Sequence, residues 1–96
     1  MNIVLSEHVR AKLQAKHAVS LKDVEECFAN RSGGLLEDDR EQHRTDPPTL
    51  WFIAPNNHGR LLKICFIQRA GRIHLRTCYP PNPTEITIYE TYGSQA

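Results

Sequence analysis

The segment RLLKICFIQRAGRIHLRTCY, residues 60–79, has the pattern of a β-hairpin whose two β-prone runs are joined at Ala70-Gly71. It carries five cationic side chains and no acidic one. The acid-free stretch extends further, from Pro47 to Thr84, although the whole chain has a net charge of only +1. Positive charge is therefore concentrated in one segment, and a cationic sheet suits a phosphate-bearing ligand, most often a nucleic acid.

A two-residue turn at Ala70-Gly71 pairs Arg69 with Arg72 and, counted outward, divides the hairpin into two faces. The face predicted to pack under helices is apolar and carries Leu62, Ile64, Phe66, Ile73 and Leu75. The opposite face is predicted to be cationic and carries Lys63, Arg69, Arg72, His74 and Arg76, with Cys65, Ile67 and Cys78 among them. In the same register Tyr79 lies opposite Leu62, on the apolar side.

Cations on a wet sheet face also serve solubility alone, and this alternative stays open. A face that serves only solubility normally includes Glu and Asp, and this one has none. The repulsion between Arg69, Arg72 and Arg76 would be relieved by an anionic ligand or by an acidic partner protein. His74 lies among them and can exchange protons near neutral pH, so it is either an acid–base group or a surface histidine.

The length of 96 residues predicts a single domain, 1–96. Ser6 and Ser20 are candidate N-caps of two helices, the first over residues 7–16 and the second from Leu21 to about Asn30. Strands are expected at 50–54, 60–68 and 72–79, with a short edge strand at 2–5; in the closing segment, 84–89, alternating isoleucines favour a strand over a helical turn. The fold class is α+β, with two N-terminal helices packed on one face of a twisted antiparallel sheet of three to five strands.

Several classes of protein do not fit this sequence. No apolar stretch is long enough to span a membrane and the first residues lack a signal-peptide pattern, so we expect a cytoplasmic protein without membrane contact. The three cysteines are widely spaced and the five histidines scattered, which argues against a disulfide framework and a metal site. We expect no cofactor, because no Gly-rich phosphate loop occurs.

An ordered set of short motifs resembles the RelE-like toxin superfamily, and within it the BrnT-type toxins and related uncharacterised short domains. The motifs span about residues 16–90. In chain order they are Lys16-His17-Ala18-Val19-Ser20, similar to a KHGVSF segment; the helix Val24–Phe28; Gly59-Arg60-Leu61-Leu62-Lys63, similar to a GRxLxV strand start; Gly71-Arg72-Ile73; and Glu85-x-x-x-Tyr89-Glu90.

The resemblance implies a metal-independent endoribonuclease, the toxin component of a toxin–antitoxin system. The expected partners are RNA and a cognate antitoxin protein, in a homodimer or a toxin–antitoxin hetero-oligomer. In this chemistry the ribose 2′-OH attacks the adjacent phosphate while protein groups move protons and stabilise the phosphorane. The candidate catalytic residues are His74, Arg76, Arg72 and Tyr79, and the candidate RNA-binding residues are Arg60, Lys63, Arg69, Lys16 and His17.

The sequence departs from the family at two places. The family strand ends in an IISAR-like run, whereas here Tyr79 stands at the position of that arginine. This favours the alternative function, a non-catalytic module that binds RNA or an acidic partner with its basic sheet face. The charged insert Asp38–Pro48 is also unlike the compact toxins, and its acidic residues are candidates to fold over the basic face and compete with RNA. Glu41 and Glu85 are the acids considered as a general base.

Overall fold

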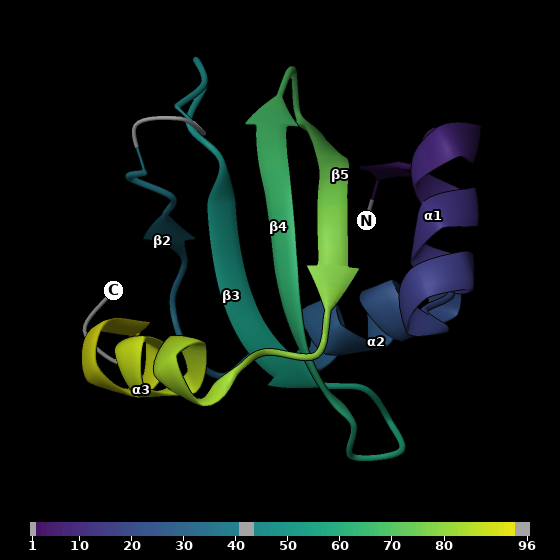
Figure 1. Cartoon of the computed structure of the whole chain (residues 1–96). Helices are drawn as coiled ribbons and strands as arrows, with labels where there is room; N and C mark the ends of the chain where they lie inside the picture. Colours follow the sequence, from purple (N-terminus) through teal and green to yellow (C-terminus); the bar gives the residue numbers. More distant parts are fainter. Residues whose placement is uncertain (1, 41–43, 94–96) are drawn as a thin grey trace.

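The computed structural model describes residues 2–40 and 44–93 and has an α+β fold built on one five-stranded sheet (Figure 1). The strand order is β1-β5-β4-β3-β2; β1 runs parallel to β5, and the other neighbours are antiparallel. The elements in chain order are β1 (Ile3–Val4), α1 (Glu7–His17), α2 (Leu21–Asn30), β2 (Leu36–Glu37), β3 (Leu50–Pro55), β4 (Leu61–Arg69), β5 (Arg72–Tyr79) and α3 (Pro83–Tyr92).

The two N-terminal helices begin at the predicted caps. Ser6 accepts a hydrogen bond from the backbone N–H of Val9 and starts α1. Ser20 and Asp23 form a reciprocal capping box that starts α2. Both helices pack on one face of the sheet, as the sequence predicts.

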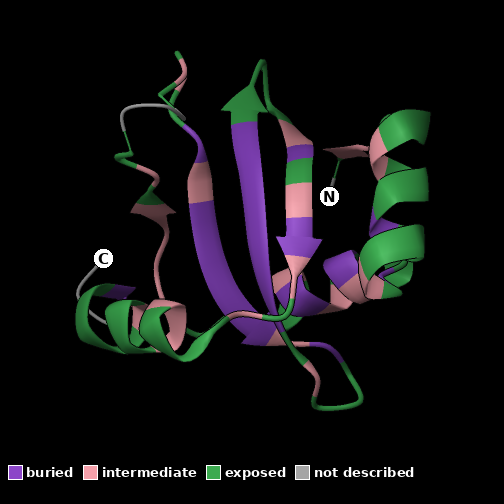
Figure 2. Ribbon diagram, viewed as in Figure 1, coloured by how far each residue is buried: buried purple, intermediate pink, exposed green. Residues whose placement is uncertain are grey.

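The main core lies between these helices and the sheet. Val24 and Cys27 of α2 and Leu13 of α1 meet a row of strand residues that includes Phe52, Ile64 and Phe66. The central strand β4 is buried along most of its length (Figure 2). Burial on both faces means that something also covers the side of β4 that faces away from α1 and α2, which we call the open face.

A third helix covers part of the open face, and the predicted closing strand at 84–89 is wrong. Asn82 caps α3, Pro83 occupies its first turn, and Glu85 returns a hydrogen bond to the Asn82 backbone N–H. Ile86 and Ile88 alternate in sequence but belong to a helix, where side chains two residues apart point in different directions. Ile86 packs toward Trp51, while Ile88 is 39% exposed.

The hairpin register is the predicted one only as far as Phe66↔Leu75. The next pair is Cys65↔Thr77, so Arg76 is an extra residue in β5 and forms a β-bulge. A shift of one residue in the register moves every later side chain of the strand to the opposite face of the sheet. Cys78 therefore turns into the helix-side core, where it is 0% exposed, and Tyr79 pairs with Lys63 on the open face. The predicted faces of Cys78 and Tyr79 are both wrong.

Because of the bulge, we expect substitutions at two neighbouring residues to change the free energy of unfolding by different amounts. Cys78→Asn places an amide in the helix-side core and should lower the free energy of unfolding by about 2–4 kcal/mol. Thr77→Asn, on the half-buried open face, should cost less than about 1 kcal/mol. Urea denaturation of both variants measures the difference. An unbulged hairpin would reverse the order, with Thr77→Asn the more damaging change.

Candidate functional site

The open face is hollowed into two adjoining pockets that share Asp38 and Arg40. We call them the Trp51 pocket, of about 560 Å³, and the Arg76 pocket, of about 360 Å³. The first is lined by Leu36, Glu37, Asp38, Asp39, Arg40, Trp51, Lys63, Glu85, Ile88 and Tyr92. The second is lined by Lys12, Asp38, Arg40, Arg44, Thr45, Thr49, Cys65, Arg76, Thr77 and Tyr79.

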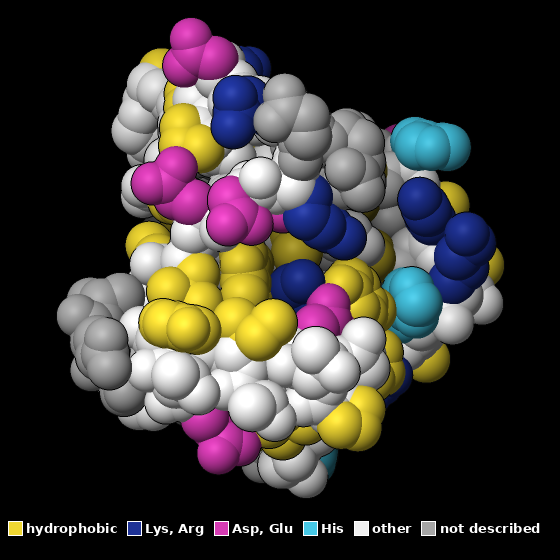
Figure 3. All heavy atoms as spheres, turned by 60° about the vertical axis from the view of Figure 1, so that its left-hand side comes forward, with side chains coloured by type: hydrophobic (Ala, Val, Ile, Leu, Met, Phe, Trp, Pro, Cys, Tyr) yellow, Lys and Arg dark blue, Asp and Glu magenta, His cyan; other side chains and the backbone are white. Residues whose placement is uncertain are grey.

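The surface around these pockets has two different characters. Figure 3 shows hydrophobic side chains gathered at a hollow, with Lys, Arg and His side chains grouped to its right. The hydrophobic group fits the Trp51 pocket, which has Leu36, Ile88 and Tyr92 in its lining. The open face is therefore less cationic than the sequence predicts, since α3 and residues 38–40 occupy part of it.

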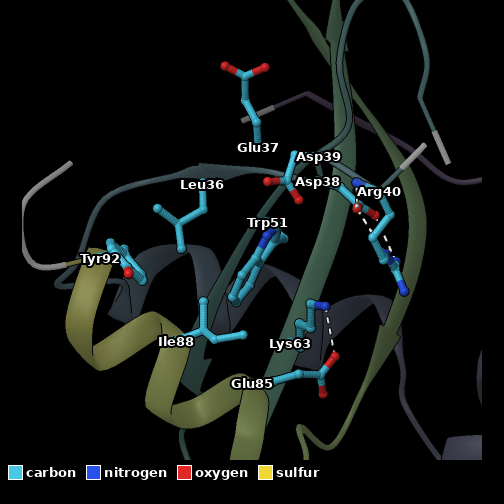
Figure 4. A pocket seen from close by; sticks show the side chains of 10 residues that line it. All are labelled: Leu36, Glu37, Asp38, Asp39, Arg40, Trp51, Lys63, Glu85, Ile88 and Tyr92. Atoms are coloured by element: carbon cyan, nitrogen blue, oxygen red, sulfur yellow. Dashed lines mark hydrogen bonds and ion pairs between the residues drawn. The ribbon is translucent and has the colours of Figure 1, made fainter.

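Lys63, Glu85 and Tyr79 form a hydrogen-bonded cluster where the two pockets meet. The Lys63 ammonium donates to Glu85 Oε2 at 2.8 Å (Figure 4), and the Tyr79 hydroxyl donates to the same oxygen at 2.6 Å. Lys63 is only 6% exposed, and its nitrogen lies 4.4 Å from the centroid of the Trp51 ring. The buried charge is thus satisfied by one carboxylate and two aromatic rings, the second being that of Tyr79.

The cluster shifts the titration of its members. Burial acts to raise the pKa of Glu85, but hydrogen bonds from Lys63, Tyr79 and the Asn82 backbone outweigh it and lower the pKa. Burial acts to lower the pKa of Lys63, and the bond to Glu85 together with its neighbours raises it overall. Burial and the bond to Glu85 raise the pKa of the Tyr79 hydroxyl above its ordinary value.

The Arg76 pocket is electropositive. Among the residues that the structure describes, its lining includes Lys12 of α1, Arg76 of the bulge, Arg40 and Arg44, together with the acid Asp38. Asp38 accepts hydrogen bonds from the Arg40 guanidinium at 3.0 and 2.8 Å, which neutralises that pair. The bulge residue Arg76 is exposed and lines the same pocket as Thr77 and Tyr79.

Two of the four predicted catalytic residues share this pocket, and two lie elsewhere. Arg76 and Tyr79 both line it. Arg72 is at the hairpin turn, seven residues from Tyr79, which is roughly 23 Å along a strand at about 3.3 Å per residue. His74 is half-buried beside β1 and lines neither pocket. One phosphate could not contact all four.

The predicted RNA-binding residues are also dispersed. Lys63 is committed to Glu85, and the Arg60 guanidinium donates to the carbonyls of His17 and Ala18 at the end of α1. Arg69 is exposed beside Arg72 at the turn, and Lys16 is exposed on α1. The His17 ring lies 5.9 Å from that of Tyr79, so this histidine borders the Arg76 pocket.

Sequence reasoning gave a small role to several residues that build the site. Trp51, in a segment whose sequence predicts a strand, is buried in the core, and it also lines a pocket. Arg40 and Lys12 carry charge but belong to no motif. Glu85 is a candidate general base in the sequence, and the signal for its structural role is Asn82-Pro83-Thr84-Glu85, a capping sequence that starts a helix and fixes the position of its acid.

Two further observations concern metal ligands and membrane helices in the described residues, and known relatives of the sequence. Within residues 2–40 and 44–93, no group of three His, Cys, Asp or Glu side chains is arranged to hold a metal ion, and no helix there has the length and apolar character to cross a membrane. Comparison of the chain with models of known protein families and with curated protein sequences found no significant match. The geometry of the open face is therefore the basis for a function.

The ion pair at the junction of the pockets predicts a pH-dependent stability. Glu85→Gln leaves the buried Lys63 ammonium without its carboxylate and should lower the free energy of unfolding by about 3 kcal/mol at pH 7. The folded-state pKa of Glu85 is lowered, so the wild type gains this stability above the ordinary glutamate pKa and loses it as pH falls through the folded value. Urea titrations between pH 3 and 7 should show the two proteins converge in acid.

Asn82→Ala is the control for the capping role of Glu85. It removes the cap at a cost of about 1 kcal/mol and leaves the carboxylate opposite Lys63. A cost of Glu85→Gln no larger than that of Asn82→Ala, and equal at pH 3 and pH 7, would contradict the assigned ion pair.

Proposed function

We propose that this protein binds single-stranded RNA through the Arg76 pocket, as a non-catalytic binding module. The observation that carries the proposal is the lining of this pocket by described residues, in which Lys12 and Arg76 stand beside the Asp38–Arg40 ion pair. Because Asp38 pairs with Arg40, the positive charges of Lys12 and Arg76 are what this part of the lining offers to a phosphate. Phosphates are the ligands most readily held by clustered arginine and lysine side chains.

Neighbouring groups extend this positive region along the protein. Lys16 and His17 follow Lys12 toward the end of α1, and the ring of His17 packs near Tyr79 at the edge of the pocket. α1 lies beside β5, so cations from a helix and from a strand border the same groove. An RNA strand held here would have successive phosphates near α1 and near the bulge.

A flexible strand fits the groove better than a duplex does. A pocket of about 360 Å³ admits a phosphate with its sugar, and Tyr79 offers a partly exposed ring at its edge. Single-stranded nucleic acids are typically held by a cationic groove combined with aromatic side chains. Arg69 and Arg72 stand apart at the hairpin turn and would contribute only at long range.

A second candidate function, metal-independent RNA cleavage, is favoured by the position of the Tyr79 hydroxyl. Tyr79 lines the basic pocket, and its hydroxyl, which donates to Glu85, holds its proton at neutral pH as an ordinary tyrosine does, with its pKa raised further by burial and by Glu85. Such a group suits protonation of the departing 5′ oxygen, while His17 would take the proton of the attacking 2′-OH. Arg76 and Lys12 would stabilise the phosphorane. In this version the basic pocket is also the surface that an antitoxin would cover.

The test is binding and cleavage of a fluorescent single-stranded RNA in EDTA over a series of salt concentrations. Arg76→Ala should weaken binding several-fold and reduce the slope of log K against log salt by about 0.7, the contribution of one lost phosphate contact. Arg72→Ala, on the same strand but at the hairpin turn, is the matched control and should change affinity less than twofold.

The products distinguish the two candidates. Intact RNA throughout supports the binding module. Fragments with 2′,3′-cyclic phosphate ends that Tyr79→Phe or His17→Ala abolishes would establish the ribonuclease. Equal losses in Arg72→Ala and Arg76→Ala, or no RNA binding by the wild type, would contradict the assignment of the Arg76 pocket.

A further inference from the structure

The Trp51 pocket is larger than the Arg76 pocket and opens beside it, yet it has a different lining. Trp51 forms its floor, Leu36 stands on one side, and Ile88 and Tyr92 of α3 stand on the other (Figure 4). Ile88 and Tyr92 are 39% and 57% exposed, unusually high for large apolar side chains four residues apart on one helix. A flat apolar group bound in the pocket would remove the exposed surface of these two side chains from water.

In the described part of the chain, most charged side chains of the Trp51 pocket form ion pairs, and one carboxylate that points into it does not. Lys63 is paired with Glu85 and Arg40 with Asp38. The carboxylate of Glu37 points away from the pocket, while that of Asp39 points toward it above Trp51 (Figure 4). Within the described residues, Asp39 makes no hydrogen bond or ion pair. The pocket therefore offers one available carboxylate over an aromatic floor.

We propose that the Trp51 pocket selects a guanine base of the bound RNA, an inference that rests on the proposed RNA binding by the Arg76 pocket. A carboxylate has two acceptor oxygens side by side and no donor. The Watson–Crick edge of guanine has two adjacent donors, N1–H and N2–H, so one carboxylate accepts both bonds. Adenine and cytosine present one donor beside an acceptor nitrogen, and uracil presents one donor between two carbonyls. Each of these bases brings an acceptor against the carboxylate of Asp39.

The shared residues make the two pockets parts of one nucleotide-sized groove. Asp38 and Arg40 line both, so a base in one pocket and a phosphate in the other are joined across a single pair of side chains. Electrostatics place them in this order, because the phosphate goes to the cationic pocket and the donor edge of the base goes to the available carboxylate. Recognition of an unpaired base by its Watson–Crick edge together with aromatic contact is common in single-stranded RNA binding.

A guanine site gives Asp39 a role beside a nucleic-acid groove. An unpaired carboxylate repels phosphate, so Asp39 would weaken a surface that recognised the backbone alone. Used to read a base, the same repulsion discriminates among sequences, because a site built to bond two N–H groups disfavours bases that lack them.

The experiment compares four RNA hexamers, UUUNUU with N as G, A, C or U, by fluorescence anisotropy in EDTA at one salt concentration. The wild type should bind the G hexamer at least tenfold more tightly than the others. Inosine keeps N1–H and lacks the amino group, so a UUUIUU hexamer should fall between G and A.

Asp39→Asn tests the residue directly. Its amide keeps one acceptor oxygen, so we expect the preference for G to fall to threefold or less, with the affinity for the other hexamers unchanged or raised. Glu25→Gln, an exposed acid-to-amide change on α2, is the matched control and should keep the full preference. Asp39 is exposed, and circular dichroism should show both variants folded.

The outcomes separate this inference from the proposed function. Tight binding of all four hexamers with equal affinity would overturn the guanine site and leave RNA binding by the Arg76 pocket intact. A preference for G that survives in Asp39→Asn would also overturn it. Absence of binding to every hexamer would overturn both proposals.

Discussion

One extra residue in β5 controls the arrangement of the open face. The bulge at Arg76 reverses the last three residues of the strand, so that Tyr79, rather than Cys78, stands beside Lys63. An uninterrupted ladder would leave Lys63 opposite a thiol and bury the Tyr79 hydroxyl under the helices, where an unbonded phenol is costly. With the bulge, the thiol fills the apolar core and the phenol reaches Glu85. Bulges re-aim side chains in this way at many binding sites.

The redirected Tyr79 also helps to hold α3 against the sheet. Glu85 connects the cap of this helix to both Lys63 and Tyr79, and Tyr89 donates from its hydroxyl to the Gly34 carbonyl at 2.7 Å. These bonds fix a helix that has no fully buried side chain of its own. Its exposed Ile88 and Tyr92 then form one side of the Trp51 pocket. The ion pair that satisfies Lys63 is thus also the support of the pocket wall.

The sequence was sufficient for the parts of the fold that depend on local signals. Ser6 and Ser20 mark helix starts, and Ala70-Gly71, with φ of 54° and 75°, forms the expected two-residue turn. The alternation of Ile86 and Ile88 favours a strand over a helical turn at 84–89, but the capping sequence that begins at Asn82 starts α3 there.

The bulge was missed for a different reason. Thr77 and Cys78 are similar in size, so no local pattern says which one belongs in the core, and packing in the helix-side core decides. The candidate site was partly predictable. Arg76 and Tyr79 were identified, but their partners Lys12, Arg40 and Glu85 come from segments far apart in the chain and meet only in the folded protein.

The central claim is that ligand binding takes place in the groove on the open face and not on the hairpin as a whole. Backbone amide chemical shifts, recorded by NMR while a single-stranded RNA containing guanine is added, test it most directly. The account predicts shifts at residues 36–40, at 76–79 and along α3, with little change at Arg69–Arg72. Shifts centred on the hairpin turn, or none on the open face when RNA is bound, would contradict it.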